Sequence, residues 1–316
     1  MTSMQTPADW PELPLAAWID TRDTLHLWLQ IVGKVRLRLT PPINHSWHST
    51  LYLTARGLTT SPIPHGHRSF QIDLDFVDHH LRIETTDGGS GGFVLEPQSV
   101  AVFYARLIDE LARMELPVRI STRPNEVAEA TPFPIDERHR SYDRDAANRF
   151  WRALSQADRV LKRFRTGFVG KCSPVHLFFG AMDLAVTRFS GRPAPVHPGG
   201  IPNLPDSVTR EAYSHEVISF GFWSGTAPID YPAFYAYAYP QPDGLAAARV
   251  RPEAAFYSSD FGEFILPYDA VRASASPDDT LIDFLESTYG AAADLAGWDR
   301  RALERGQISF FPPLQK

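Results

Sequence analysis

Histidine and carboxylate residues are concentrated between positions 167 and 223, where they interrupt otherwise apolar sequence. Imidazole and carboxylate groups are the usual protein ligands of Zn, Fe and Mn, and two histidines with one carboxylate leave coordination positions open for a reaction. We therefore predict a divalent-metal site formed by His176, His215, Glu211 and Asp183. No tight spacing supports it, because the four residues belong to separate elements. The alternative is that these groups are hydrogen-bonded structural residues.

The same groups would also serve in acid–base catalysis, because burial in apolar strands shifts the pKa values of ionisable side chains. We expect His176 and His215 to act as general bases if they are not ligands, with Glu216 as a carboxylate partner. A second histidine pair, His45 and His48, lies in the first third of the chain. We expect His48 to line the same cleft. The alternative is that these histidines also have structural roles.

Several cations and one tyrosine are predicted to bind the ligand. Arginine and lysine bind carboxylates and phosphates, arginine often through two parallel hydrogen bonds. We therefore assign an anion-binding role to Lys171, Arg188, Arg192 and Arg56, although each would equally suit an ordinary ion pair. In the alternating run 234–239 the tyrosines share one strand face, so Tyr237 would line an aromatic cleft or belong to the core.

Hydrophobic periodicity predicts the elements that position these residues. Apolar residues at helical spacing predict helices over 20–32, 97–114, 144–165 and 278–295, with Gly33 as the stop of the first. Alternation or short apolar runs predict strands over 35–40, 48–56, 70–76, 80–85, 93–95, 116–120, 176–179, 184–189, 215–222, 234–239, 254–257 and 263–266. The chain is therefore expected to be α+β, with mainly antiparallel sheets flanked by helices.

The order of helix, strands and helix occurs twice, which indicates two similar halves. Short words also recur, such as Val32-Gly33-Lys34 and Val169-Gly170-Lys171. We predict an internal duplication that places a ligand cleft between the halves. The expected boundaries are an N-terminal arm at 1–17, a first half at 18–124, a connector at 125–142, a second half at 143–298 and a tail at 299–316.

Composition limits the classes of partner. The 316 residues carry a formal net charge of -6 without a basic run, which argues against broad nucleic-acid binding. No apolar run approaches the roughly 18 residues of a membrane helix. The single cysteine, Cys172, rules out an intrachain disulfide and fits a reducing compartment. We expect a cytoplasmic protein with a small-molecule ligand, and the sequence does not indicate an oligomeric state.

Several words carry a resemblance: 30–34 (QIVGK), 57–61 (GLTTS), 173–176 (SPVH), 188–192 (RFSGR) and 211–216 (EAYSHE). In these the chain resembles an uncharacterised bacterial protein family, a domain of unknown function, over about residues 18–298. The resemblance implies one full-length unit in a bacterial cytoplasm and no particular mechanism. The leading hypothesis is an enzyme acting on a small polar or anionic molecule, with the predicted metal site assisting the reaction. The alternative is a non-catalytic small-ligand binding protein that uses the same cleft.

Overall fold

The computed structural model describes residues 9–226 and 228–306, which form helices and two six-stranded antiparallel sheets. The first sheet contains β1 (Tyr52–Leu53), β2 (Gly57–Thr59), β3 (Ile63–His65), β4 (Arg68–Asp75), β5 (His80–Thr85) and β6 (Ser90–Val94). The second contains β7 (His176–Phe178), β8 (Asp183–Pro193), β9 (His215–Trp223), β10 (Ala233–Tyr239), β11 (Phe256–Ser258) and β12 (Glu263–Pro267). The predicted α+β class is confirmed.

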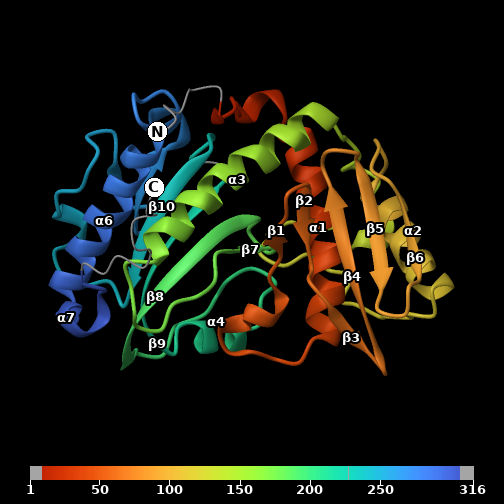
Figure 1. The fold of residues 1–316 in the computed structure, drawn as a ribbon, viewed down its shortest axis with the longest axis horizontal. Coiled ribbons are helices and arrows are strands. Elements are labelled where there is room, and N and C mark those ends of the chain that lie inside the picture. The colour runs from red at the N-terminus through yellow and green to blue at the C-terminus, as the bar shows by residue number, and fades with distance from the viewer. Residues whose placement is uncertain (1–8, 227, 307–316) are drawn as a thin grey trace, which may run out of the picture.

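The two sheets lie edge to edge and are joined at one point (Figure 1). Leu51 and Leu177 exchange two backbone hydrogen bonds of 2.8 Å, so that the edge strands β1 and β7 run antiparallel at this seam. Outward from the seam the order is β2-β4-β5-β6 on one side and β8-β9-β10-β12-β11 on the other. A long helix precedes each set of strands, and another follows it. This arrangement agrees with two similar halves, whereas the duplication itself stays a prediction.

Four long helices cover the sheets: α1 (Ile19–Leu39), α2 (Val100–Arg113), α3 (Arg144–Arg165) and α6 (Pro277–Leu295). In the first half α1 and α2 pack together, with the rings of Trp28 and Phe103 stacked 4.6 Å apart. In the second half α3 and α6 pack on one face of β8, β9 and β10 (Figure 1). The short helices are α4 (Asp206–Ala212), α5 (Tyr268–Arg272) and α7 (Arg300–Leu303). None of the helices in the described ranges is long and apolar enough to cross a membrane.

The described part of the N-terminal arm packs onto the second half. Trp10, Leu13 and Leu15 are buried, and the ring of Trp10 packs 6.2 Å from that of Phe234 on β10. The hydroxyl of Tyr268 donates a 2.8 Å hydrogen bond to a backbone carbonyl of the arm. The arm therefore supports the helix-covered side of β10. Residues 307–316 of the expected C-terminal tail lie outside the described residues.

Most predicted elements are confirmed, and the helix at 144–165 has the predicted bounds. The strand predicted at 35–40 is wrong, because α1 continues to Leu39. The alternating Val-Arg-Leu-Arg pattern is misleading since Arg36 points inward and is only 7% exposed. Gly33 does not stop the helix. The ring of Phe179 lies where its Cβ would be, at 2.1 Å, so that the glycine permits close packing across the seam.

Two further strand predictions are wrong. The segment predicted as a strand at 48–56 contains a 3-10 turn, η3 (Asn44–Ser49), and only the two residues of β1. His45 and Ser46 adopt left-handed backbone angles, with φ of 60° and 58°, which interrupt any extended conformation. Residues 116–120 are irregular. The β-branched residues Val118 and Ile120 alone did not make a strand there, because no neighbouring strand pairs with the segment.

Replacing Gly33 with alanine is expected to lower the free energy of unfolding by about 1 kcal/mol. Alanine gains roughly 1 kcal/mol of helix propensity. Forcing its methyl group against Phe179 costs about 1–3 kcal/mol, because overpacking moves a buried ring. Urea denaturation measures the net loss. In a Phe179→Ala background the same substitution should become stabilising, and a loss that persists there would contradict the steric explanation.

Candidate functional site

The face of the second sheet that points away from α3 and α6 carries its polar side chains. Alternation along β8 places Asp183 and Thr187 on this face and Arg188 on the helix-covered face. Thr187 is paired with Ser219 of β9, and their hydroxyls lie 2.9 Å apart. Tyr235 is paired with Gly221, and a Cβ on this glycine would lie 2.4 Å from the tyrosine hydroxyl. Glycine therefore makes room for the ring on the sheet.

Three tyrosines and three carboxyl groups gather there, which we call the acid–tyrosine site: Glu126, Asp183, Tyr213, Tyr235, Tyr237 and Glu263. The hydroxyl of Tyr235 donates a 2.5 Å hydrogen bond to Asp183, and its ring stacks on that of Tyr237 with centroids 6.0 Å apart. The hydroxyl of Tyr237 lies 2.8 Å from that of Tyr213, which follows α4. Burial raises the pKa of Tyr213 to about 12, so its hydroxyl stays protonated and can donate.

Glu126 reaches the site from the connector between the halves. Its backbone has a φ of 59°, and its N–H donates a 2.8 Å hydrogen bond to the carbonyl of Pro202. The carboxyl group lies over Gly180, where a Cβ would be 1.8 Å from Oε1. A left-handed residue and a glycine contact thus fix the carboxyl group at the start of β8. Such strain is concentrated at functional sites in proteins.

The carboxyl groups have raised pKa values. Burial raises the pKa of Glu263 to about 8 and that of Glu126 to about 7, and the negative charge of Asp183 raises both further. Burial raises the pKa of Asp183 itself to about 6, against the lowering effect of the Tyr235 hydrogen bond. Glu126 as a residue is exposed although its carboxyl group is crowded, so solvent reaches the site and screens this carboxyl group. Among the described residues, no Lys or Arg forms an ion pair with any of the three.

This arrangement can hold and move protons near neutral pH. A carboxyl group with a pKa near the working pH can act as acid or base, and tyrosine hydroxyls can donate hydrogen bonds to developing charge. Three carboxyl groups without a basic partner also disfavour an anion. The chemistry that suits the site is therefore proton transfer on an uncharged or cationic molecule.

The four predicted metal ligands are not brought together. Asp183 begins β8, whereas His215 is paired with Pro193 at its other end, about 30 Å away at the usual rise per residue. Glu211 lies on α4, and His176 lies at the seam, completely buried. In ranges 9–226 and 228–306, no group of three or more His, Cys, Asp or Glu side chains could hold a metal ion. The register of β8 with β9 therefore holds Asp183 and His215 at opposite ends of these two strands.

The predicted anion-binding cations also lie apart. Arg188 is 1% exposed on the helix-covered face, with its guanidinium carbon 3.5 Å from the ring centroid of Phe164. Arg192 forms an ion pair of 2.7 Å with Glu216, and Arg56 one of 2.6 Å with an aspartate of β4. These three arginines bind groups of the protein itself, so the structure gathers no anion site from them.

Lys171 and His48 have local partners as well. The ammonium group of Lys171 donates a 2.6 Å hydrogen bond to Nε2 of His45, which in turn donates through Nδ1 to the carbonyl of Ala212 at 2.9 Å. His48 is buried, and its Nδ1 accepts a 3.1 Å hydrogen bond from the backbone N–H of Ile43. These contacts hold η3 against the second sheet. Of the predicted residues, only Asp183 and Tyr237 belong to the acid–tyrosine site.

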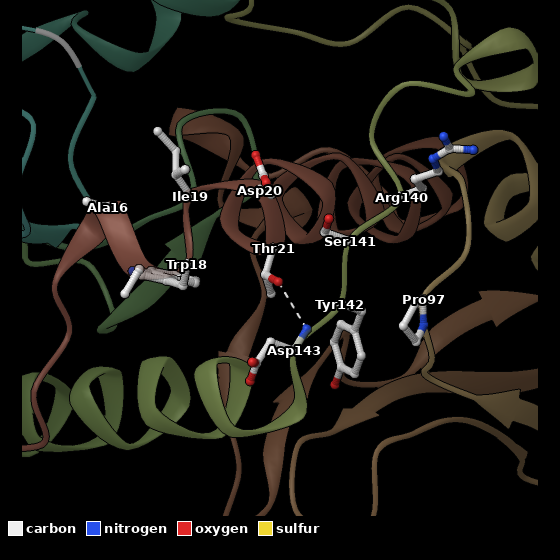
Figure 2. Close-up of a pocket in the computed structure, with 11 residues that line it drawn as sticks. Ala16, Trp18, Ile19, Asp20, Thr21, Pro97, Arg140, Ser141, Tyr142 and Asp143 are labelled. Atoms are coloured by element: carbon white, nitrogen blue, oxygen red, sulfur yellow. Dashed lines mark hydrogen bonds between the residues drawn. The ribbon is translucent and has the colours of Figure 1, made fainter.

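Two surface hollows lie away from the acid–tyrosine site. One of about 430 Å³ lies between the start of α1 and residues 140–143 (Figure 2). Thr21 accepts a 3.0 Å hydrogen bond there from the backbone N–H of Asp143, whereas the charged side chains of Asp20 and Arg140 also line the hollow. A second of about 200 Å³ lies beside β9, where Glu216 is paired with Arg192. Neither hollow is lined by as many ionisable side chains as the acid–tyrosine site, which remains the best candidate.

Sequence reasoning missed Glu126, Glu263 and Tyr213 as site residues. The alternating run 234–239 did signal that its tyrosines share a face, and this is confirmed by their pairing with β9. Glu263 directly opens a predicted strand, which is a weak signal. Glu126 and Tyr213 lie in irregular or cap positions, where no periodicity indicates a direction.

One comparison with known proteins gives a match. Residues 10–305 match a protein family described as "Family of unknown function (DUF5996)". No curated protein and no solved structure matches the chain. The match covers both halves and the connector between them, including every residue of the acid–tyrosine site.

Proposed function

The chain belongs to this family of unknown function, and we propose from its site that it is an enzyme that transfers protons on a small polar molecule. The observation that carries the proposal is the convergence of Glu126, Asp183 and Glu263 on one sheet face, with pKa values raised to between about 6 and 8. Groups with such values exchange protons readily at neutral pH, which catalysis requires. The cytoplasm of a bacterium stays the predicted location.

Each group would have a defined role. Glu263 would be protonated at neutral pH and act as the general acid, because its pKa is raised to about 8. Asp183 would be mostly ionised and act as the general base, held in place by the hydroxyl of Tyr235 at 2.5 Å. The half-buried ring of Tyr237, stacked on the buried ring of Tyr235, would bind a flat apolar part of the substrate. The substrate would be uncharged or cationic, since the site offers negative charge and hydroxyl groups.

The alternative is a binding protein that uses the same site without turnover. The tyrosine surface favours it, because stacked aromatic rings bind ligands without any need for proton transfer. The two functions differ in a measurable way. Binding alone needs the tyrosines and tolerates a carboxamide in place of a carboxyl group, whereas catalysis needs the proton.

A ligand screen tests the proposal. Wild-type protein is mixed with matched sets of small amines, polyols, amides and carboxylates, and the thermal midpoint is recorded. We expect stabilisation by uncharged or cationic compounds, followed by chemical change of at least one hit in NMR spectra. Glu263→Gln and Asp183→Asn should bind the hit but convert it at least about 100-fold more slowly.

The control is Glu84→Gln, which removes an exposed carboxyl group from β5 in the other sheet and should behave as wild type. Stabilisation by carboxylates alone would contradict the proposal. Hits that bind without conversion, and bind equally well to both site variants, would identify the binding alternative. Hits that ignore all three substitutions would place the ligand elsewhere in the molecule.

A further inference from the structure

The seam between the halves contains a buried histidine whose ring nitrogens have no partner. His176 is 0% exposed, and neither Nδ1 nor Nε2 makes a hydrogen bond to any atom of residues 9–226 and 228–306. A neutral imidazole carries one donor and one acceptor, and buried polar groups in proteins are nearly always hydrogen-bonded. Two unpartnered nitrogens on one buried ring therefore point to a bound species.

A buried arginine lies at the same place. Arg36 of α1 is 7% exposed, and its Nε donates a 2.7 Å hydrogen bond to the carbonyl of His48. Its Nη1 is buried without a partner. Among the described residues, no carboxylate forms an ion pair with this guanidinium. A buried charge is ordinarily paired, because leaving it alone in a poorly polar interior is costly.

The strand pairing at the seam brings the two groups together. The Leu51–Leu177 bridge places Tyr52 of β1 opposite His176 of β7, with their ring centroids 6.2 Å apart. The guanidinium of Arg36 lies over the same tyrosine ring, 5.4 Å from its centroid. Its charge also reaches His176 and adds to the effect of burial, which together lower the pKa of the imidazole to about 3. His176 is therefore neutral, with one N–H to donate.

Aromatic rings complete the surroundings of His176. The ring of Phe178 lies 4.8 Å from the imidazole, and that of Trp47 lies 6.2 Å from it. These rings offer no acceptor to Arg36 and no competing positive charge. Tyr52 also provides a side-chain hydrogen bond to Arg36, but a neutral hydroxyl does not balance the charge, so the seam combines a guanidinium without a counter-charge and one free N–H among aromatic rings. A metal cation is disfavoured there, because the fixed charge of Arg36 would repel it.

We propose that the seam binds a small monovalent anion between Nη1 of Arg36 and the ring N–H of His176. A halide or a lone carboxylate has the charge and the acceptor capacity that the two groups lack. Water would satisfy the hydrogen bonds but would leave the guanidinium without a counter-charge. The anion would join the halves, because Arg36 and Tyr52 belong to the first and His176 to the second.

Crystals of the full chain soaked in sodium bromide give the most direct test. We expect an anomalous difference peak within hydrogen-bonding distance of both Arg36 Nη1 and His176. A parallel soak in sodium formate distinguishes a carboxylate from a halide. Ordered water in place of either anion would overturn the proposal, and so would bromide peaks confined to other positions.

Solution measurements complement the crystals. At constant ionic strength, bromide or formate should raise the thermal midpoint of the wild-type protein. Arg36→Met should weaken the apparent affinity at least about tenfold, since a counter-charge is lost. His176→Phe should weaken it less. Arg38→Met, on the exposed side of the same helix, is the matched control and should bind as wild type.

A midpoint that rises equally in Arg36→Met would contradict the proposal. Circular dichroism verifies that each variant is folded. If Arg36→Met does not fold, Arg36→Lys replaces it as a variant that keeps the charge. The bromide soak of wild-type crystals then still shows whether an anion binds at the seam. The acid–tyrosine site is a separate group of residues, so failure of this proposal leaves the proposed enzyme function untouched.

Discussion

Replacing Arg188 with alanine is expected to lower the free energy of unfolding by about 3–5 kcal/mol. The guanidinium is 1% exposed and lies 3.5 Å and 4.3 Å from the ring centroids of Phe164 and Tyr289. Its Nη2 donates a 2.6 Å hydrogen bond to the carbonyl of Phe164 near the end of α3. Alanine would leave a cavity, an unpaired carbonyl and two rings without their cation. Urea denaturation at neutral pH measures the loss.

Two variants separate the causes of this loss. Arg188→Met keeps most of the side-chain volume and therefore avoids the cavity, although it still loses the hydrogen bond and the charge. Its loss of unfolding free energy should be smaller than that of Arg188→Ala. Arg188→Lys keeps the charge but loses the stacking of the planar guanidinium on the rings. Its loss of unfolding free energy should lie between those of the other two variants. The sequence suggested an anion-binding role for this residue. A stable Arg188→Ala protein with altered ligand binding would restore that role and contradict the structural one.

The stability of the protein is expected to fall as pH rises from 7 to 8.5, and Glu263→Gln should remove most of the fall. The folded pKa of Glu263, about 8, is above its ordinary value of 4.5. The folded state therefore binds more protons than the unfolded state between these values, so the free energy of unfolding decreases as pH rises. At pH 8.5 the variant should be more stable by about 2 kcal/mol, after allowance for solvent screening of a partly exposed group.

Glu126, with a pKa raised to about 7, and Lys34, with a pKa lowered by burial to about 8, also titrate near this window, so the test is the difference between wild type and Glu263→Gln. Burial lowers the pKa of His26, His45 and His176, so their effect on stability has the opposite sign and is complete below about pH 7. Denaturation curves at pH 7.0, 7.5, 8.0 and 8.5 measure the slope for wild type, Glu263→Gln and the exposed control Glu84→Gln. A wild-type slope of zero, or one that Glu263→Gln leaves unchanged, would show that the folded pKa is not raised.

Much of the fold follows from hydrophobic periodicity, and the exceptions have physical causes. The stripe on 144–165 and the alternation on 80–85 predicted α3 and β5 with the right bounds, because both elements pack one face on the core. The pattern at 35–40 failed because Arg36 is buried at a seam between two sheets. Alternation of apolar and polar residues does not distinguish a strand from a helix when one of the polar residues is itself buried.

The site was partly predictable by counting along one strand. Asp183 and Arg188 are five residues apart, an odd number, so a strand places them on opposite faces. This signal was available and argues against one shared site for both. The position of Glu126 in space was not predictable. The residue lies in an irregular connector with a left-handed φ of 59°, where no helix or strand periodicity indicates the direction of its side chain. Nor could the sequence reveal that register puts His215 at the far end of β8 from Asp183.

The single Leu51–Leu177 bridge gives each half something that it lacks alone. An edge strand with free N–H and C=O groups is a template for pairing with other chains, and β1 and β7 cover each other's edges. The bridge links residues far apart in sequence, whereas most pairings lie within one half, so local contacts can build each half first. Until the seam closes, both halves would expose unprotected edges. Self-association is therefore the characteristic hazard of a chain in which only one half has folded.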